Sequence, residues 1–250
     1  MPGKDTNIGA KRAREARAEL GLGADPLECL LSTIEDQLEI PVIAAELPEQ
    51  IDGCCWRDGA ATILWLNGTR VPVRQRFTLA HELGHLRCAH VGSIPPESFL
   101  TLNGKQTDSR EIQANAFAAE FLAPAAGITA QLGGREAELE DVVGLAILHR
   151  ISSIAALYRL NSLGLTSRYE DLKAAIEAGE DDPIWEKLAP EYPDDLIEGL
   201  SAGSLPRLSP GLQASAFASA IGGTTSIGDA AAATGCDPDA LSAAVASIGA

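Results

Sequence analysis

The segment from His81 to His85 reads His-Glu-Leu-Gly-His, and it constrains the fold of this 250-residue chain more than any other feature. On an α-helix, residues four positions apart lie one turn apart on the same face. Two imidazoles placed in this way can bind one metal ion, with Glu82 beside them. The competing interpretation is a helix with two ordinary histidines and a neighbouring glutamate, so the pattern needs support from its surroundings.

A catalytic metal site needs a third protein ligand and an open position for water. His90 lies five residues beyond His85, and a continued helix would point it away from the face that His81 and His85 share. We therefore interpret His90 as a surface or supporting residue. Cys88 is nearer that face but lies about a turn beyond His85, and a small buried apolar role is the simpler interpretation.

The segment 107–124 offers another candidate, because its helical pattern places Glu111 and Asn115 four positions apart on one face. A carboxylate ligand and an amide that orients a ligating histidine would use this spacing. The same residues also fit a capping box from Asp108 to Glu111 at the start of the helix. Spacing alone leaves these two interpretations open.

Other helices are predicted on either side of these motifs. The charged residues 9–20 predict a short helix, and a second helix is predicted to begin at Asp25, which would be its cap. Pro72 suits the first position of the helix that carries the histidines. This helix is predicted to run to about His90.

A small sheet is predicted between the second and third of these helices. Three segments are short and rich in β-branched or aromatic residues, as strands are: 40–47, 51–56 and 61–67. Trp56 and Trp65 are predicted to pack this sheet, with substrate stacking as the alternative.

The second half of the chain is predicted to be mainly helical. Residues 138–164 predict two short helices with a tight turn between them. Residues 169–200 are strongly acidic and interrupted by prolines, which indicates a solvated connector or a loosely packed helix pair. Residues 206–250 are rich in alanine and predict a small helical module. Helix starts are predicted there at Ser209, Ser226 and Asp237.

The net charge of −16 argues against a nucleic-acid partner. Acidic residues outnumber basic ones most strongly after residue 125, whereas duplex binding needs a basic face. Apolar residues make up 46% of the chain, but no apolar run is long enough to span a membrane. The five cysteines are odd in number and two are adjacent, which favours reduced thiols. The basic first twenty residues lead into no apolar segment, so we expect a cytoplasmic protein that binds no membrane.

Two segments resemble the paired signatures of the ImmA/IrrE-type metallopeptidases. RQRFTLAHELGHL resembles R-x-R-F-T-x-A-H-E-x-G-H, and EIQANAFAAEFLAP resembles E-x-x-A-N-x-F-A-x-x-[LF]-L-x-P. This resemblance implies that three residues bind the metal, namely His81, His85 and Glu111. It also implies that Glu82 is the general base and that Asn115 supports the site.

The resemblance extends over roughly residues 25–165 and implies a zincin-like fold of the α+β class. We expect a mainly helical peptidase core with a small antiparallel or mixed sheet, followed by a helix-turn-helix-like pair and a small helical C-terminal module. The predicted parts are a metallopeptidase core (1–135), a helix-turn-helix-like segment (136–168), an acidic linker or helical connector (169–205) and an Ala-rich C-terminal module (206–250).

The implied activity is hydrolysis of peptide bonds with one zinc ion per chain, and manganese is the alternative ion. Glu82 would accept the proton of the attacking water. A residue that stabilises the oxyanion is also required, and His149 and Tyr158 are the available candidates downstream. Members of the family that resemble this chain typically cleave a helix-turn-helix repressor, often encoded nearby. Cleavage relieves repression of a mobile-element or stress-response operon.

Two other functions would use the same sequence differently. A non-catalytic binding partner, antitoxin-like or anti-repressor, would sequester its target protein without cutting it, but the complete set of site residues favours an enzyme. A DNA-binding regulator would use residues 138–164. The charge disfavours it, because Arg150 and Arg159 are the only arginines or lysines in that segment.

Overall fold

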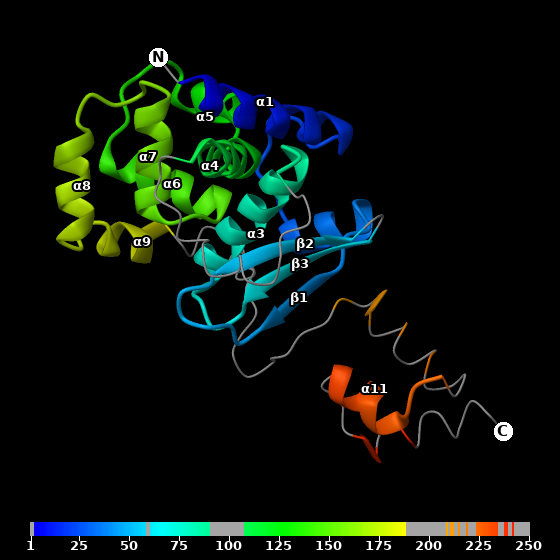
Figure 1. The fold of residues 1–250 in the computed structure, drawn as a ribbon. Helices are drawn as coiled ribbons and strands as arrows, with labels where there is room; N and C mark the ends of the chain where they lie inside the picture. The colour runs from blue at the N-terminus through cyan, green and yellow to red at the C-terminus, as the bar shows by residue number, and fades with distance from the viewer. Residues whose placement is uncertain are drawn as a thin grey trace.

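Helices α3 (Pro72–Arg87) and α4 (Ser109–Leu122) form the centre of the molecule. The structure is a computed structural model that describes residues 3–58, 61–90 and 108–188, with short stretches between 209 and 242. Figure 1 shows α3 with a small sheet on one side and α4 on the other, and α1 (Lys4–Glu19) packs along α4. The helix with the two histidines therefore lies between the sheet and the rest of the helical core.

Three strands form the sheet: β1 (Val42–Ala45), β2 (Gly53–Asp58) and β3 (Ala61–Asn67). Their order is β1-β3-β2, so β3 is the central strand. It runs parallel to β1 and antiparallel to β2. The predicted α+β fold with a small mixed sheet is confirmed.

One face of this sheet is buried. Val42 on β1 and Leu64 and Leu66 on β3 are at most 3% exposed, and α3 contacts both β2 and β3. Because side chains alternate between the two faces of a strand, Trp65 lies on the opposite face, where it is 37% exposed. Trp65 therefore packs on the outer face of the sheet and not in the core. The side chain of Trp56 lies outside what the structure describes.

The helix predicted to begin at Asp25 begins later, which corrects the prediction. Helix α2 spans Leu30–Ser32 and continues as one π-helical turn, η1 (Thr33–Gln37). Its cap is Cys29, whose sulfur accepts a hydrogen bond from the Ser32 N–H.

Two buried arginines explain why the preceding segment is not helical. Arg17 donates hydrogen bonds to the carbonyl oxygens of Leu22, Gly23 and Asp25. Arg76 donates to the carbonyl oxygen of Leu27. Carbonyl groups that a helix would use internally are therefore satisfied by side chains from α1 and α3. The cap and proline pattern is a local signal, and these side-chain contacts, among them the long-range contact of Arg76, override it.

The helices after α4 are α5 (Ala125–Leu132), α6 (Leu139–His149), α7 (Ser153–Ser162), α8 (Tyr169–Glu177), α9 (Asp182–Leu188) and α11 (Ile227–Thr234). Helices α6 and α7 meet at a bend of 109°, and Arg150 at the turn has a left-handed φ of 54°. The predicted helix pair within 138–164 is confirmed. Among the described residues, no single helix is long and apolar enough to cross a membrane, and only the bent α6–α7 pair meets that test, by length and composition alone.

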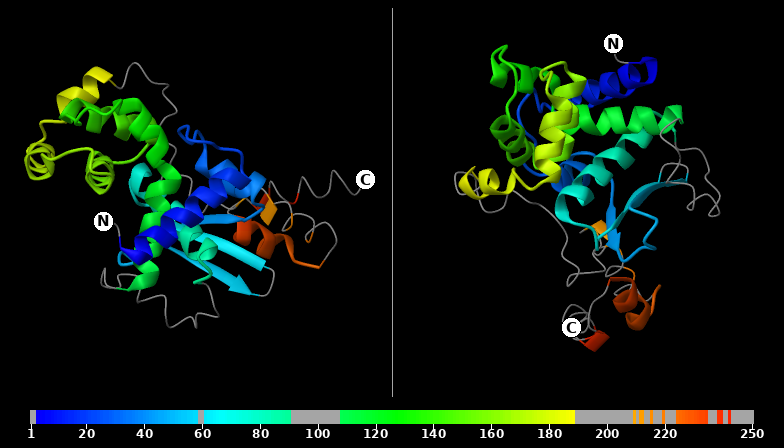
Figure 2. Two further views of the ribbon diagram at one scale, coloured as in Figure 1. Left: turned by 90° about the horizontal axis from the view of Figure 1, so that it is seen from above. Right: turned by 90° about the vertical axis from the view of Figure 1, so that its left-hand side faces the viewer.

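The acidic segment and the C-terminal module are described in part. Helices α8 and α9 show that the first part of the acidic segment is a helix pair, and Figure 2 shows α6 to α9 grouped on the side of α4 away from the sheet. Ser226 caps α11 by accepting a hydrogen bond from the Asp229 N–H, so that helix start is confirmed. Residues 211–212 and 238–239 are helical, and most of the helices predicted to start at Ser209 and Asp237 lies outside the described residues.

Helices α1 to α8 share one hydrophobic core. Phe117 and Phe121 of α4 are fully buried, and their stacked rings lie 5.3 Å apart between centroids. The same cluster includes Leu79 of α3, Leu145 of α6 and Leu160 of α7. Residues on both sides of position 135 therefore contribute to one core, and the division of the chain into four parts stays a prediction.

Candidate metal centre

Helices α3 and α4 approach each other closely at Gly84. A β-carbon at Gly84 would lie 3.0 Å from the Phe117 Cβ atom and 3.1 Å from both the Cα atom and the carbonyl oxygen of Ala114. Such contacts are tighter than ordinary van der Waals packing, and two of these atoms belong to the backbone. The glycine of the His-Glu-Leu-Gly-His segment therefore sets the spacing of the helices. This spacing brings Glu111 of α4 to the histidines of α3.

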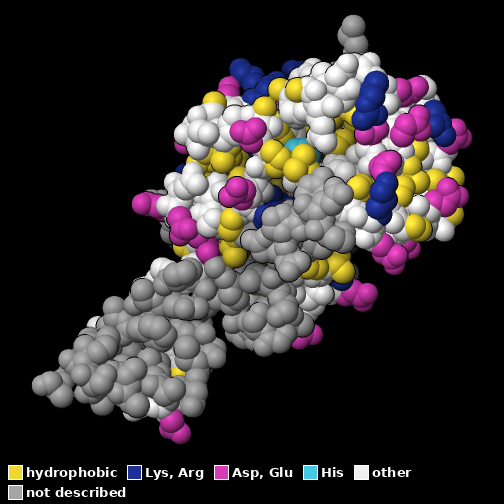
Figure 3. All heavy atoms as spheres, turned by 180° about the vertical axis from the view of Figure 1, so that it is seen from behind, with side chains coloured by type: hydrophobic (Ala, Val, Ile, Leu, Met, Phe, Trp, Pro, Cys, Tyr) yellow, Lys and Arg dark blue, Asp and Glu magenta, His cyan; other side chains and the backbone are white. Residues whose placement is uncertain are grey.

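Three side chains converge where the two helices meet. The Nε2 atoms of His81 and His85 lie 3.0 Å apart. Each of them lies 3.3 Å from a different carboxylate oxygen of Glu111. These side chains are between 11% and 17% exposed, and Figure 3 shows histidine surface among apolar side chains. The group is thus shielded from most of the solvent but still reaches the surface.

This donor set fits a divalent ion of the zinc type. Two imidazole nitrogens and one carboxylate oxygen are a set of ligands that catalytic zinc sites use, and the fourth position is left for water. Ligand atoms on one tetrahedral zinc lie about 3.3–3.5 Å from each other, and the separations here are 3.0–3.3 Å. Within the described part of the chain, this is the one group of three such side chains close enough to hold an ion.

Asn115 lies one turn beyond Glu111 and contacts the first histidine. Its Oδ1 atom is 2.9 Å from Nδ1 of His81. Because an amide oxygen only accepts hydrogen bonds, Nδ1 carries the proton and Nε2 keeps its lone pair facing Glu111. The capping box is not formed: Asp108 caps α4 by accepting from the Arg110 N–H, and the Glu111 carboxylate lies against the histidines instead.

Glu82 is turned from α3 toward strand β2. Its carboxylate accepts a hydrogen bond from the backbone N–H of Cys55, and the residue is 4% exposed. A β-carbon at Gly53 would lie 2.6 Å from the Thr78 methyl group and 3.4 Å from Glu82 Cγ, so the glycine lets the strand approach the helix. Burial raises the pKa of Glu82, although the two histidines partly oppose this shift. Burial and Glu82 also raise the pKa of the Cys54 and Cys55 thiols to about 12.

His90 is closer to the site than predicted. Its Nδ1 atom lies 3.1 Å from Nδ1 of His85. Helix α3 ends at Arg87, and Ala89 has a left-handed φ of 58°, which turns the chain back toward the helix. The predicted direction of His90 was wrong because it assumed that the helix continued. The distance is consistent with the supporting role that was the other part of the prediction.

Contacts within the group shift the pKa of Glu111 and of His81. When Nε2 of His81 or His85 takes up a proton in the metal-free group, it donates to the Glu111 carboxylate, and these hydrogen bonds hold the pKa of the Glu111 carboxyl far below its usual range. Burial acts to lower the pKa of His81, but the hydrogen bond with Glu111 and the charges of Glu82 and Glu111 outweigh it, and the pKa is raised. A proton and a metal ion would therefore compete for the His81 nitrogen that faces Glu111.

The two candidates for the oxyanion stabiliser have their contacts elsewhere. His149 is 2% exposed, and its Nδ1–H donates to the Leu122 carbonyl oxygen at 3.1 Å. Burial lowers the pKa of His149 to about 4, so this imidazole is neutral at neutral pH. Tyr158 is 53% exposed, and its ring lies 5.6 Å from the ring of Tyr169. The structure brings neither residue into the group formed by α3 and α4.

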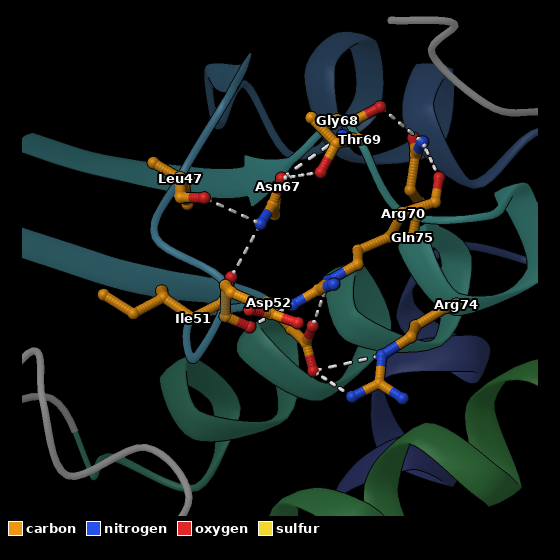
Figure 4. Close-up of polar contacts among 10 residues, drawn as sticks. Leu47, Ile51, Asp52, Asn67, Gly68, Thr69, Arg70, Arg74 and Gln75 are labelled. Atoms are coloured by element: carbon orange, nitrogen blue, oxygen red, sulfur yellow. Dashed lines mark hydrogen bonds and ion pairs between the residues drawn. The ribbon is translucent and has the colours of Figure 1, made fainter.

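Polar contacts at the start of α3 were missed by the sequence analysis. Arg70 Nε donates to Asp52 Oδ1 at 2.8 Å, and Arg74 Nε donates to Asp52 Oδ2 at 3.1 Å, as Figure 4 shows. The Gln75 amide donates to the carbonyl oxygen of Gly68 at 3.1 Å. These contacts fix the first turn of α3 to the end of the sheet, and so fix the direction of its histidines. Arg74 opens the R-x-R-F-T pattern, which was the available signal.

Comparison with known proteins agrees with this geometry. The model of the peptidase family Peptidase_M78, described as the IrrE N-terminal-like domain, matches residues 35–161, just over half of the chain. The match includes the strands, α3, α4 and the α6–α7 pair, and it leaves out α1. No curated protein matches the sequence. The helix pair with its His, His and Glu donors and the family match lead to one conclusion: this chain belongs to the IrrE N-terminal-like peptidase family, whose type of function is that of a metallopeptidase.

Proposed function

We propose that this protein is a zinc-dependent, site-selective endopeptidase that cleaves a helix-turn-helix transcriptional repressor. The observation that carries the proposal is the convergence of His81 and His85 of α3 with Glu111 of α4, beside the buried Glu82 of α3. Membership of a peptidase family supports a protein substrate. The chemistry of the donors supports zinc as the ion.

In this proposal each histidine binds the ion through Nε2, and Glu111 binds it through a carboxylate oxygen. The bound ion supplies a Lewis acid, which lowers the pKa of water and polarises the scissile carbonyl group. The Glu82 carboxylate accepts the proton that the attacking water loses, and it returns this proton to the nitrogen of the leaving amine as the C–N bond breaks. Burial raises the pKa of Glu82, so its carboxylate is a stronger base than that of an exposed glutamate.

Asn115 has a positioning role in the proposal. By accepting the Nδ1 proton of His81, it holds the imidazole with the Nε2 lone pair directed at the ion site. A rotation of the ring would cost this hydrogen bond. Asn115 therefore fixes the orientation of the His81 imidazole before an ion binds.

The choice of a repressor as substrate rests on the family resemblance and on charge. DNA-binding domains carry basic surfaces, and α8 presents acidic side chains to solvent, with Asp171 76% exposed and Glu177 62% exposed. Complementary potentials speed the encounter of such partners. Cleavage would relieve repression of a mobile-element or stress-response operon, and the proposed setting is the cytoplasm.

We also propose how the parts of the chain divide this work. Residues 1–135 would hold the catalytic site, and residues 136–168 with 169–205 would bind the substrate protein. Residues 206–250 would control access or bind a partner. Deletion of residues 206–250, followed by measurement of cleavage, tests the last assignment.

The test of the function compares wild type with Glu82→Gln. Each is co-expressed with the repressor encoded beside it, and both repression and repressor fragments are followed. We expect fragments and relief of repression with wild type, and a loss of about 10²–10⁴ in cleavage rate with Glu82→Gln. The matched control is Glu28→Gln, because Glu28 is exposed on another segment. Equal relief by wild type and Glu82→Gln without fragments would establish sequestration of the target in place of cleavage.

A further inference from the structure

We propose that His90, Gln113 and Asp5 position the imidazole of His85, so that the N-terminal helix α1 takes part in building the metal site. Three hydrogen bonds in series connect the imidazole to α1. The inference rests on the proposed role of His85 as a metal ligand. It extends the site beyond the residues 35–161 that the family model matches, because Asp5 lies on α1.

The distances define a continuous chain of contacts. Nδ1 of His85 lies 3.1 Å from Nδ1 of His90. Nε2 of His90 lies 3.1 Å from Oε1 of Gln113. Nε2 of Gln113 donates to Oδ1 of Asp5 at 2.8 Å, and the Ser109 hydroxyl donates to Oδ2 of the same carboxylate at 3.0 Å. The Asp5 carboxylate of α1, the last acceptor in the series, is thus also fixed by Ser109, the first residue of α4.

The donor and acceptor roles follow from the end of this chain. The Asp5 carboxylate only accepts, so the nitrogen of the Gln113 amide must face it and the amide oxygen must face His90. That oxygen also only accepts, so His90 carries its proton on Nε2 and accepts at Nδ1. His85 must then donate from Nδ1. Its Nε2 lone pair is left directed at Glu111, where the proposed ion would lie.

Asn115 performs the same task for His81 in one step. The two histidines of the site are therefore held in the same tautomer by two different routes. One route ends on α4 at Asn115, whereas the other runs through His90 and Gln113 to α1. The second route lets the position of α1 affect the metal site.

Helix α1 packs closely against α4 beside Gln113. At Gly9, an added β-carbon would lie 2.0 Å from the Gln113 carbonyl oxygen and 3.0 Å from Ala116 Cβ. Helix α1 therefore lies directly against α4 at Gln113. The left-handed Ala89 brings His90 back to His85 at the other end of the route.

The test measures zinc affinity of the full-length metal-free protein by competition with a chromophoric chelator. His90→Leu removes the acceptor, and we expect zinc affinity to fall about 10–100-fold, as loss of such supporting contacts does in other zinc sites. His90→Asn can keep an acceptor near Nδ1 and is expected to lose less. Asp5→Asn should lose affinity when His90 is present but should add little in the His90→Leu background. Cobalt(II) absorption spectra should shift in the same variants, because they report ligand geometry.

A merely structural role predicts a different pattern. If α1 only stabilises the fold, the Asp5→Asn and His90→Leu effects on zinc affinity add independently, and this outcome overturns the inference. The matched control is Glu15→Gln, which removes an exposed carboxylate on the same helix and should leave zinc affinity unchanged. Thermal unfolding of each metal-free variant identifies any that fail to fold.

His85→Ala separates this inference from the proposed function. If wild type binds zinc and His85→Ala does not, the metal site stands. Unchanged affinity and cobalt spectra in both His90 variants then reject the inference alone. If wild type and His85→Ala bind zinc equally, the proposed metal site itself is wrong.

Discussion

Each end of helix α4 carries a glutamate, but one lies beside imidazoles and the other beside a guanidinium group. Glu111 and Glu120 are about two and a half helical turns apart, so they lie on opposite faces of the helix. Glu111 faces the imidazoles of α3 and is 17% exposed. Glu120 forms a salt bridge with Arg159 of α7 and is 4% exposed.

The two glutamates differ in whether their partner side chains can still bind a cation. An imidazole that donates from one nitrogen keeps a lone pair on the other, so Glu111 and its histidines together can take up a cation. A guanidinium offers only donors, and those of Arg159 are used by Glu120 and by the Ala123 carbonyl oxygen. Arg17 closes the same end of α4 by donating to the Phe121 carbonyl oxygen at 2.6 Å. One glutamate is therefore arranged for binding, and the other holds the fold together.

The largest expected effect is on stability and comes from Glu120→Gln. The substitution leaves a buried guanidinium without its anion, which costs about 3–5 kcal/mol in the free energy of unfolding. Urea unfolding followed by circular dichroism measures this loss. Zinc affinity of the folded protein should stay within about twofold of wild type, since the other end of α4 is untouched. A loss in stability under about 1 kcal/mol would contradict the structural role of this pair.

Glu111→Gln, the same change at the other end, should give the reverse pattern. Zinc affinity should fall at least about 100-fold, or about 3 kcal/mol, because a binding energy of about 10–16 kcal/mol is divided over about four ligands. The metal-free protein should lose less stability than Glu120→Gln does, because the Glu111 carboxylate is 17% exposed and Glu120 is 4% exposed. Chelator competition and urea unfolding give the two values. The comparison of the two ends fails if both glutamate variants show the same profile.

The next effect is the pH dependence of stability that arises from His149, which contacts the C-terminal end of α4. Burial lowers the pKa of His149 from 6.5 to about 4, so folding favours the neutral imidazole. Its stabilising effect is therefore complete above pH 6.5 and is lost as the pH falls toward 4, by about 3 kcal/mol. His149→Gln keeps a donor for the Leu122 carbonyl oxygen but does not titrate. The free energy of unfolding, measured from pH 7 to 4, should fall less steeply in this variant, and parallel curves would reject the prediction.

The smallest expected effect comes from Gly84, which sets the spacing between α3 and α4 at the metal site. Gly84→Ala introduces a methyl group against the backbone of Ala114, which should cost about 1–3 kcal/mol and also weaken zinc binding by moving α3 from α4. Gly144→Ala on α6 is the matched control, because an added β-carbon there meets nothing within 4 Å. This control should stabilise the protein by about 0.5–1 kcal/mol, since alanine favours a helix over glycine. Thermal unfolding and chelator competition compare the pair. Equal effects of the two substitutions would show that Gly84 does not set the spacing.

Much of the fold could be predicted because its signals are local. Strand β3 coincides with the predicted segment 61–67, and α4 lies within the predicted helix 107–124. The start of α2 could not be predicted, because Arg76 reaches the segment before it from α3, 49 positions away in the sequence. The outward position of Trp65 depends on which face of the sheet α3 covers, and this too is nonlocal.

The candidate site shows the same division. The spacing of His81 and His85 indicated a shared face, and the family resemblance pointed to Glu111. The route from His85 through His90 to Asp5 could not be predicted, since it joins residues from three separate segments. It also depends on the left-handed turn at Ala89, a residue type that carries no signal for that conformation.

By itself, the sequence determined which helix would carry the histidines and which short segments would pair as a sheet. The spacing of apolar residues and the position of turn residues determine secondary structure over a few positions, so helices and strands can be predicted from the sequence. The family resemblance pointed to Glu111, but only the tertiary structure showed why Glu111 meets imidazoles whereas Glu120 meets guanidinium groups. That choice depends on the close crossing at Gly84 and on the arginines of α1 and α7, and no local pattern specifies these contacts. The same two carboxylates thus acquire a binding role and a structural role from their neighbours.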